Sequence, residues 1–168
     1  MRPLFAAVAL AAYLLDLTTK HLAVTRLDPG ETHSLIGDLL SLHLTFNPGA
    51  AFSMGTNATV FLSLLAIAAV TFIVWTARRL GSRLWALSLG LLLAGIGGNL
   101  TDRVFRNPAP LRGHVIDFLQ LPHWPVFNVA DMAILGGGAT LLLAVFKGID
   151  VDGSLVSEDS EDDEVPAP

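Results

Sequence analysis

The sequence predicts an all-α membrane protein in which four transmembrane helices carry a small β-like cradle. Three observations support this fold class. The 168-residue chain is 52% hydrophobic and only 15% charged, with a mean hydropathy of +0.60, which is too apolar for an ordinary soluble domain. It contains four apolar segments of a length that can cross a bilayer. The two long connections between them are more polar, and both contain extended-looking runs.

The charge distribution divides the chain in two. Residues 148–168 hold eight acids and no Lys or Arg, whereas residues 1–147 hold ten basic and seven acidic side chains. The acidic tail also lacks aromatic residues, so we expect it to be disordered, beside a membrane domain at 1–147. The chain has no cysteine, which excludes disulfides and thiol nucleophiles. No basic patch is interleaved with aromatics, so no nucleic-acid partner is expected.

The first span is predicted over residues 4–24. The uncharged run Leu4–Leu15 resembles the core of a signal peptide, but apolar residues resume at Leu22–Val24, which favours a retained membrane helix. Asp16 and Lys20 are spaced i, i+4 on one face of this helix and are expected to form an ion pair. Charges inside a span are costly and often functional, and we expect this pair to brace a site.

A strand is predicted in the connection 25–57. Apolar residues alternate with polar ones from Leu40 to Phe46, which is the period of a strand with one apolar face. Asn47-Pro48-Gly49 then forms a typical turn sequence.

The second and third spans are predicted at Ala58–Ala77 and Leu84–Thr101. The short connection between them contains three arginines, at positions 78, 79 and 83, which indicates a cytoplasmic side. Asn99 and Arg103 lie near the far end of the third span, spaced i, i+4.

The fourth span is predicted at Phe127–Phe146. The connection before it, 102–126, also contains three arginines, so the charge rule does not decide the orientation by count. Four spans place both termini on one side and the connections 25–57 and 102–126 together on the other.

Two aspartates, Asp117 and Asp131, lie fourteen positions apart around a bend at Pro122 and Pro125. A loop that returns one aspartate to another at the start of an apolar helix suits two carboxylates that share a proton and activate water. The alternative is that Asp131 is a helix N-terminal charge and Asp117 an acid of a surface loop. The polar residues of the spans and connections fall on one membrane face, which favours a shared site: Asp16, Lys20, Asn47, Asn99, Arg103, Asp117, Asn128 and Asp131.

The sequence resembles the lipoprotein signal peptidase (signal peptidase II) family over nearly all of residues 4–147. Five motifs in the same order carry the resemblance: DLTTK (16–20), FNPGAAFS (46–53), GIGGNLTDR (95–103), GHVIDF (113–118) and FNVAD (127–131). It implies an intramembrane aspartic endopeptidase of the bacterial inner membrane, with cytoplasmic termini, an extracytoplasmic cradle and a site facing outward. The implied catalytic pair is Asp117 and Asp131.

The same matching implies a supporting shell of Asp16, Lys20, Asn47, Gly95, Asn99, Arg103, Asn128 and Ala130. The implied substrate is a diacylglyceryl-modified prolipoprotein, cut before its lipidated cysteine by a monomeric, membrane-embedded enzyme without a cofactor or metal. Ala94 departs from the family, which usually has glycine there, and we expect tighter packing without loss of activity.

Three alternatives remain open from the residues. A proton-coupled transporter would use Asp16, Asp117 and Asp131 as a relay, but no internal repeat is evident. A non-catalytic anchor would use the motifs only for packing. A serine–lysine peptidase would use Ser53 and Lys20, although Asp16 is the nearer partner of that lysine. Five histidines occur without HExxH or comparable spacing, so no metal is expected.

Overall fold

The computed structural model describes residues 1–49 and 56–155, in which long helices alternate with short strands. The elements in chain order are α1 (Arg2–Arg26), β1 (Thr32–Ile36), β2 (Leu40–Asn47), α2 (Thr56–Thr76), the short 3₁₀ helix η2 (Ala77–Arg79), α3 (Arg83–Phe105), β3 (Val115–Gln120) and α4 (Val129–Phe146). Each long helix coincides with one of the apolar runs of the sequence, and each meets the length and hydropathy required to cross a bilayer.

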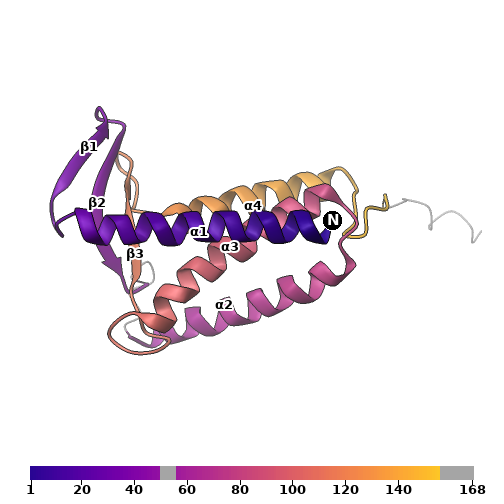
Figure 1. Ribbon diagram of the computed structural model, residues 1–168, viewed down its shortest axis with the longest axis horizontal. Helices are drawn as coiled ribbons and strands as arrows, with labels where there is room; N and C mark the ends of the chain where they lie inside the picture. The colour runs from indigo at the N-terminus through magenta and orange to yellow at the C-terminus, as the bar shows by residue number, and fades with distance from the viewer. Residues whose placement is uncertain (50–55, 156–168) are drawn as a thin grey trace, which may run out of the picture.

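Helix α3 is the centre of the bundle and packs against α1, α2 and α4 (Figure 1). Small residues allow this close approach. A Cβ on Gly90 would lie 3.0 Å from Val8 of α1, and a Cβ on Gly137 of α4 would lie 3.0 Å from the Ser88 carbonyl of α3. The Ser88 hydroxyl donates to the Gly137 carbonyl at 2.8 Å, so small and hydroxyl residues join the two helices as in other membrane bundles.

The outer faces of the helices are covered by large apolar side chains. Phe61, Leu65, Leu135 and Phe146 are all exposed to the surroundings of the bundle. A surface of this kind is unfavourable in water and suits contact with lipid chains.

The three strands form one antiparallel sheet in the order β1-β2-β3. Strand β2 comes from the first long connection and β3 from the second, and their register sets Thr45 opposite Asp117. Leu44, Ile116 and Phe118 are buried against Ala23 of α1. The sheet lies at one end of the bundle, and the N-terminus lies at the other (Figure 1). The two long connections therefore meet at one end, as predicted.

The predicted strand in the first connection is confirmed as β2, but β1 was not predicted. All five residues of β1 are exposed, so the strand has no buried face to produce an alternating pattern. Helix α3 continues past the predicted end at Thr101 to Phe105, which brings Asp102 and Arg103 into the helix.

The start of the acidic tail differs from the prediction of disorder from residue 148 onward. Residues 149–155 form a small loop, which we call the C-terminal clasp, closed by a bridge between Ile149 and Leu155. The Val151 carbonyl accepts hydrogen bonds from the amides of Gly81 at 2.9 Å and Ser82 at 3.2 Å. The indole of Trp85 donates to the Ile149 carbonyl at 2.8 Å.

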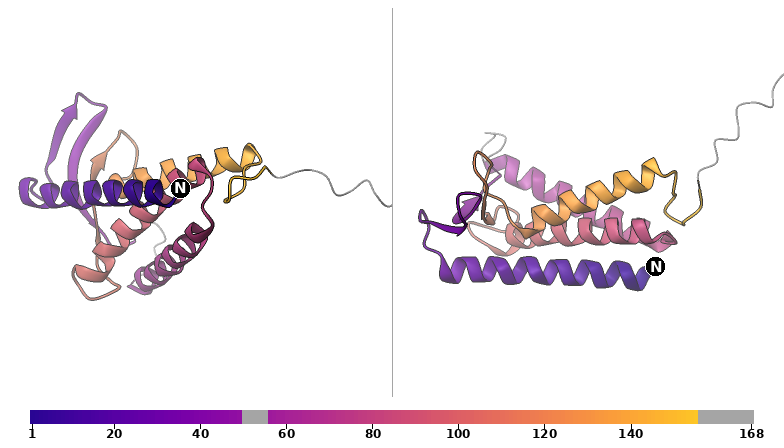
Figure 2. Two further views of the ribbon diagram at one scale, coloured as in Figure 1. Left: turned by 45° about the vertical axis from the view of Figure 1, so that its right-hand side comes forward. Right: turned by 90° about the horizontal axis from the view of Figure 1, so that it is seen from above.

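The clasp therefore rests on the connection between α2 and α3, at the end of the bundle opposite the sheet (Figure 2). The contacts are made mainly by backbone atoms, so they require no apolar side-chain pattern. Residues 156–168 lie outside the described part of the chain.

Candidate active site

Asp117 is held at the middle of β3 with only 2% of its surface exposed. Each of its carboxylate oxygens accepts a hydrogen bond from an asparagine amide: Oδ2 from Asn47 at 2.9 Å and Oδ1 from Asn128 at 2.6 Å. Asn47 is oriented by a local turn, in which its own Oδ1 accepts from the Gly49 amide at 2.8 Å. Gly49 has a φ of +95°, a conformation that favours glycine, so the predicted turn positions the Asn47 side chain.

Asp131 lies in the first turn of α4, where it forms a reciprocal cap with Asn128. Asn128 Oδ1 accepts from the Asp131 amide at 3.0 Å, and Asp131 Oδ2 accepts from the Asn128 amide at 3.1 Å. The other carboxylate oxygen, Oδ1, accepts from the Asn99 side chain of α3 at 2.8 Å. A carboxylate in the first turn is also favoured by the positive end of the helix dipole.

Asn128 joins the two aspartates. This fully buried residue donates its side-chain amide to Asp117 and its backbone amide to Asp131. Asp117 and Asp131, which the sequence analysis paired, therefore accept hydrogen bonds from the same residue. They belong to one network, although one lies on a strand and the other on a helix. The hypothesis that Asp117 is a surface acid is wrong, because its side chain is buried.

The environment of Asp117 favours its protonated form. Burial raises the pKa of the Asp117 carboxyl to about 6, and the charge of Asp131 adds to this effect, while the hydrogen bonds from Asn47 and Asn128 oppose it. The shift has the direction needed for a carboxyl that keeps a proton beside an ionised partner.

Lys20 lies behind this pair with no exposed surface. Its ammonium contacts Asp16 Oδ2 at 2.9 Å, which confirms the predicted i, i+4 ion pair, and Asp102 Oδ2 at 2.8 Å. It also donates to Asn99 Oδ1 at 2.9 Å. Because the Asn99 oxygen faces Lys20, the Asn99 Nδ2 group points at Asp131. The ion pair therefore helps to orient the side chain that donates to Asp131.

Asp102 is a member of this network that the sequence did not identify. It is 1% exposed and binds Lys20, Arg106 and the Ile116 amide, the last at 3.3 Å. It thus connects α1 and α3 to the strand that carries Asp117. The i, i+4 spacing of Asp102 and Arg106, at the end of α3 and its C-cap, was the available signal, but the helix was predicted to end at Thr101.

Asp16 and two small residues define how closely α1, α3 and α4 approach. Asp16 Oδ1 accepts from the Ala130 amide at 2.9 Å. A Cβ on Gly95 would lie 2.4 Å from the Ala130 carbonyl, and one on Gly98 would lie 2.4 Å from Asp16 Oδ2. Gly95 and Ala130 therefore act through packing, and substitution at Gly95 would push α4 away.

Arg103 is half-buried near the pair, and its Nη1 atom has no hydrogen-bond partner among the described residues. A buried guanidinium N–H without an acceptor is an available donor. Ser53, which belongs to the alternative serine–lysine hypothesis, lies outside the described residues. Within residues 1–49 and 56–155, no three His, Asp or Glu side chains are placed to hold a metal ion together.

Residues 8–147 match the family described as signal peptidase (SPase) II. The chain is 51% identical over 145 residues to a lipoprotein signal peptidase of Mycolicibacterium smegmatis, covering 86% of this chain and 62% of that protein, which is less than two thirds of its length. It is 49% identical over 149 residues to one of Mycobacterium avium, covering 89% and 82% respectively.

Two solved structures have the same fold. A bacterial membrane enzyme structure at 1.9 Å superposes with a TM-score of 0.77 at 25% identity, covering 85% of this chain and 92% of that one. Another, at 2.3 Å, superposes with a TM-score of 0.76 at 24% identity, covering 94% and 93%. With the family match spanning almost all of the four-helix region, the chain belongs to the signal peptidase II family of membrane peptidases.

Proposed function

We propose that this protein is an aspartic endopeptidase that removes the signal peptide from diacylglyceryl-modified prolipoproteins by cutting before the lipidated cysteine. The observation that supports this most directly is the pair Asp117 and Asp131, held by one asparagine at the end of an apolar bundle. Lipoprotein signal peptidase is also the name of the relatives at about half identity.

In this mechanism one carboxylate of the pair is ionised and takes a proton from water, which attacks the scissile carbonyl. The other is protonated and donates a hydrogen bond to the carbonyl oxygen. The raised pKa of Asp117 favours it as the protonated member, which leaves Asp131 as the base. In this mechanism the pair holds one proton between its two carboxyls, because like charges side by side resist double ionisation.

The remaining polar groups position these reactants. Asn47, Asn99 and Asn128 hold the carboxylates. Arg103 Nη1, which has no hydrogen-bond partner among the described residues, donates in this mechanism to the backbone carbonyl of a bound precursor. Both roles depend on buried donors of fixed direction, which is what preorganised stabilisation requires.

A cavity of about 280 Å³ lies beside this site, between α2, α3 and α4. Its lining combines Asn99 and Arg103 with apolar side chains of α2, α3 and α4, including Leu62, Leu65 and Ile134. An acylated peptide requires such a surface, because its acyl chains remain in lipid while its backbone reaches the polar site. This requirement accounts for a peptidase built inside a membrane.

The direct test is cleavage of a diacylglyceryl-modified precursor by the purified protein in detergent. We expect a single cut before the modified cysteine, unchanged by a chelator. An unmodified precursor should be a poor substrate, because it lacks the acyl chains that the apolar surface contacts. Failure to cleave the lipidated precursor under conditions where the protein is folded would contradict the proposed function.

We further propose that the protein is a monomer of the inner membrane, with cytoplasmic termini and the sheet outside. The arginines at positions 78, 79 and 83 lie at the end with the termini, as the positive-inside rule requires. Since the chain has no cysteine, Thr32→Cys and Ser154→Cys provide single labels at exposed sites at opposite ends. We expect an impermeant thiol reagent applied outside to label only the first; labelling of both would contradict this orientation.

The pKa of Asp117 predicts a pH-dependent difference in stability between wild type and Asp117→Asn. A carboxyl with its pKa raised from 3.8 to about 6 stabilises the folded state below the unfolded pKa, and this stabilisation is lost as pH rises through about 6. Relative to wild type, Asp117→Asn should therefore gain roughly 2 kcal/mol in unfolding free energy between pH 4 and pH 7.

Unfolding measured in detergent at both pH values tests this, with Asp38→Asn, at an exposed residue of the hairpin turn, as the matched control. If the unfolding free energies of Asp117→Asn and wild type differ by the same amount at both pH values, the pKa of the Asp117 carboxyl is not raised.

A further inference from the structure

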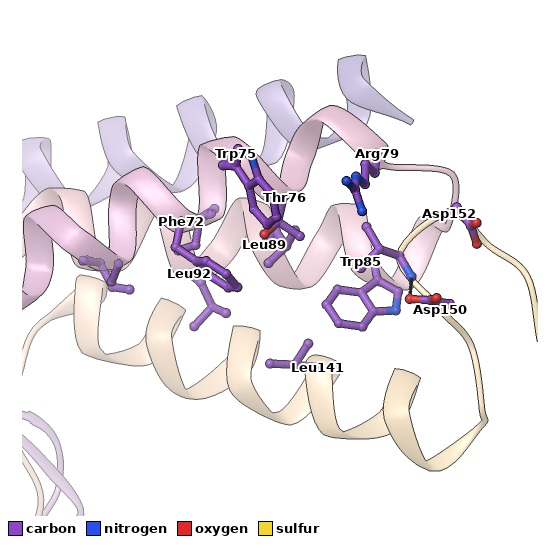
Figure 3. A pocket seen from close by; sticks show the side chains of 14 residues that line it. Phe72, Trp75, Thr76, Arg79, Trp85, Leu89, Leu92, Leu141, Asp150 and Asp152 are labelled. Atoms are coloured by element: carbon purple, nitrogen blue, oxygen red, sulfur yellow. Dashed lines mark hydrogen bonds between the residues drawn. The ribbon is translucent and has the colours of Figure 1, made fainter. Parts of the chain in front are cut away.

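A large apolar cavity lies at the end of the bundle opposite the aspartate pair. It has a volume of about 550 Å³, is partly open, and is lined by residues of α2, η2, α3, α4 and the C-terminal clasp (Figure 3). Most of its wall consists of large apolar side chains: Phe72, Trp75, Trp85, Leu89, Leu92 and Leu141.

This cavity continues toward the candidate active site. The smaller cavity beside Asn99 and Arg103 shares two lining residues with it, Ala69 and Ile96. The two are therefore neighbouring parts of one groove along α2, from the site to the clasp. A helix of the length of α2 measures roughly 30 Å at 1.5 Å per residue, which is the thickness of the hydrocarbon core.

The clasp gives the far end of the groove an acidic mouth. Asp150 and Asp152 line the cavity and are exposed, and neither belongs to an ion pair within the described residues. Their hydrogen bonds are local, from the Val151 amide and from Ser154. Six further acids follow between positions 158 and 164 of the sequence.

One cation, Arg79, also lines this cavity, and its guanidinium lies 5.4 Å from the centre of the Trp75 ring. The guanidinium keeps its full charge in such an interaction, so the lining holds two carboxylates and one cation, a net charge of −1. Two carboxylates at the mouth repel an anion such as a phospholipid phosphate and attract a cationic group, so the charge of the mouth selects between these two occupants.

A signal peptide has the complementary composition: a positively charged N-terminal region followed by an apolar core. We propose that the groove binds the apolar core of the precursor's signal peptide and that Asp150 and Asp152 bind its basic N-terminal region. This inference rests on the proposed function, since the groove starts at the cavity beside the aspartate pair. It gives the clasp a role in substrate recognition separate from the chemistry.

The test compares two lipidated precursors, one with three lysines in its N-terminal region and one with glutamines in their place. The double variant Asp150→Asn/Asp152→Asn keeps the side-chain acceptors of Val151 and Ser154 but removes both charges. In zwitterionic nanodiscs we expect its KM for the lysine precursor to rise roughly three- to tenfold, as for a few exposed ion pairs, with kcat retained. Its KM for the glutamine precursor should equal that of wild type, and the difference should shrink at high salt.

Asp28→Asn/Asp38→Asn is the matched control, because it removes two exposed charges at the opposite end. An unchanged KM for the lysine precursor, or equal changes for both precursors, would overturn the proposal. The proposal would also be overturned if a truncation after Leu155 removed the preference for the lysine precursor while the double variant kept that preference. A double variant that changes only the affinity for phosphatidylglycerol would instead identify a lipid site.

The failure of this inference is distinguishable from failure of the proposed function. If wild type cleaves neither precursor, the proposed function is contradicted. In that case the groove proposal is tested separately by binding of the two isolated signal peptides. The readout is the fluorescence of Trp75 and Trp85, which lie in the groove wall. Equal affinity of wild type for the lysine and glutamine peptides would overturn it.

Discussion

Asp117→Asn and Asp131→Asn should each abolish cleavage of a lipidated precursor, by at least roughly 10³-fold, the scale of a lost general acid or base. Each substitution retains the size of the side chain and one acceptor oxygen but removes the titratable proton. The double variant should be hardly worse than either single one, because groups that act as a unit have non-additive effects. A simple loss of packing would make the double variant additive.

Two controls separate chemistry from folding and from other mechanisms. Precursor binding and detergent-solubilised yield should remain near wild type, since an asparagine still occupies each position beside Asn128. Ser53→Ala should cleave at the wild-type rate. A serine–lysine peptidase requires the opposite, but the Lys20 ammonium already contacts Asp16, Asp102 and Asn99. Substantial cleavage by either asparagine variant would contradict the aspartic mechanism.

The elements that could be predicted are those that bury apolar side chains, because burial leaves a periodic pattern in the sequence. The four spans follow from long apolar runs, and β2 follows from the alternation between Leu40 and Phe46, because its apolar face packs on α1. The proximity of Asp117 and Asp131 was inferred from the bend at Pro122 and Pro125. In the structure it also depends on the antiparallel bridge between Leu119 of β3 and Phe127, the residue before Asn128, which no local pattern specifies.

The features that the sequence did not indicate are formed by backbone contacts or by exposed residues. Strand β1 pairs through its backbone while all its side chains are exposed. The clasp is held by the Val151 carbonyl, and a Cβ on Gly81 would clash with the Asp152 carbonyl at 1.7 Å. Composition alone registers the eight acids of residues 148–168 and predicts disorder for the whole segment.

Asp102 was missed for a different reason. Buried charges are identified when they lie inside a predicted span, and Asp102 lies just beyond the apolar run, in the last turn that extends α3. Its importance comes from Lys20 of α1 and the Ile116 amide of β3. These partners are distant in sequence, so only the packed structure shows that one acid joins three elements.

The same network predicts the largest change in stability. Lys20→Met retains the length and apolar stem of the side chain but leaves Asp16 and Asp102, each 1% exposed, without their shared counter-charge. Removing one partner of a buried ionic network costs about 3–5 kcal/mol, because the remaining charges are left uncompensated. We expect this loss in unfolding titrations in detergent, together with reduced cleavage, since Asn99 Oδ1 loses the Lys20 ammonium and keeps the Asn128 amide as its donor at 3.2 Å.

A second substitution should restore part of this stability, and the two acids should differ in how much. Without Lys20, Asp102 still binds Arg106 and the Ile116 amide, whereas Asp16 retains only the Ala130 amide. Lys20→Met/Asp16→Asn removes the carboxylate that is left with fewer partners and keeps an acceptor for the Ala130 amide. It should therefore be more stable than Lys20→Met/Asp102→Asn. The opposite order, or a loss below about 1 kcal/mol for the single variant, would show that the ammonium does not hold these helices together.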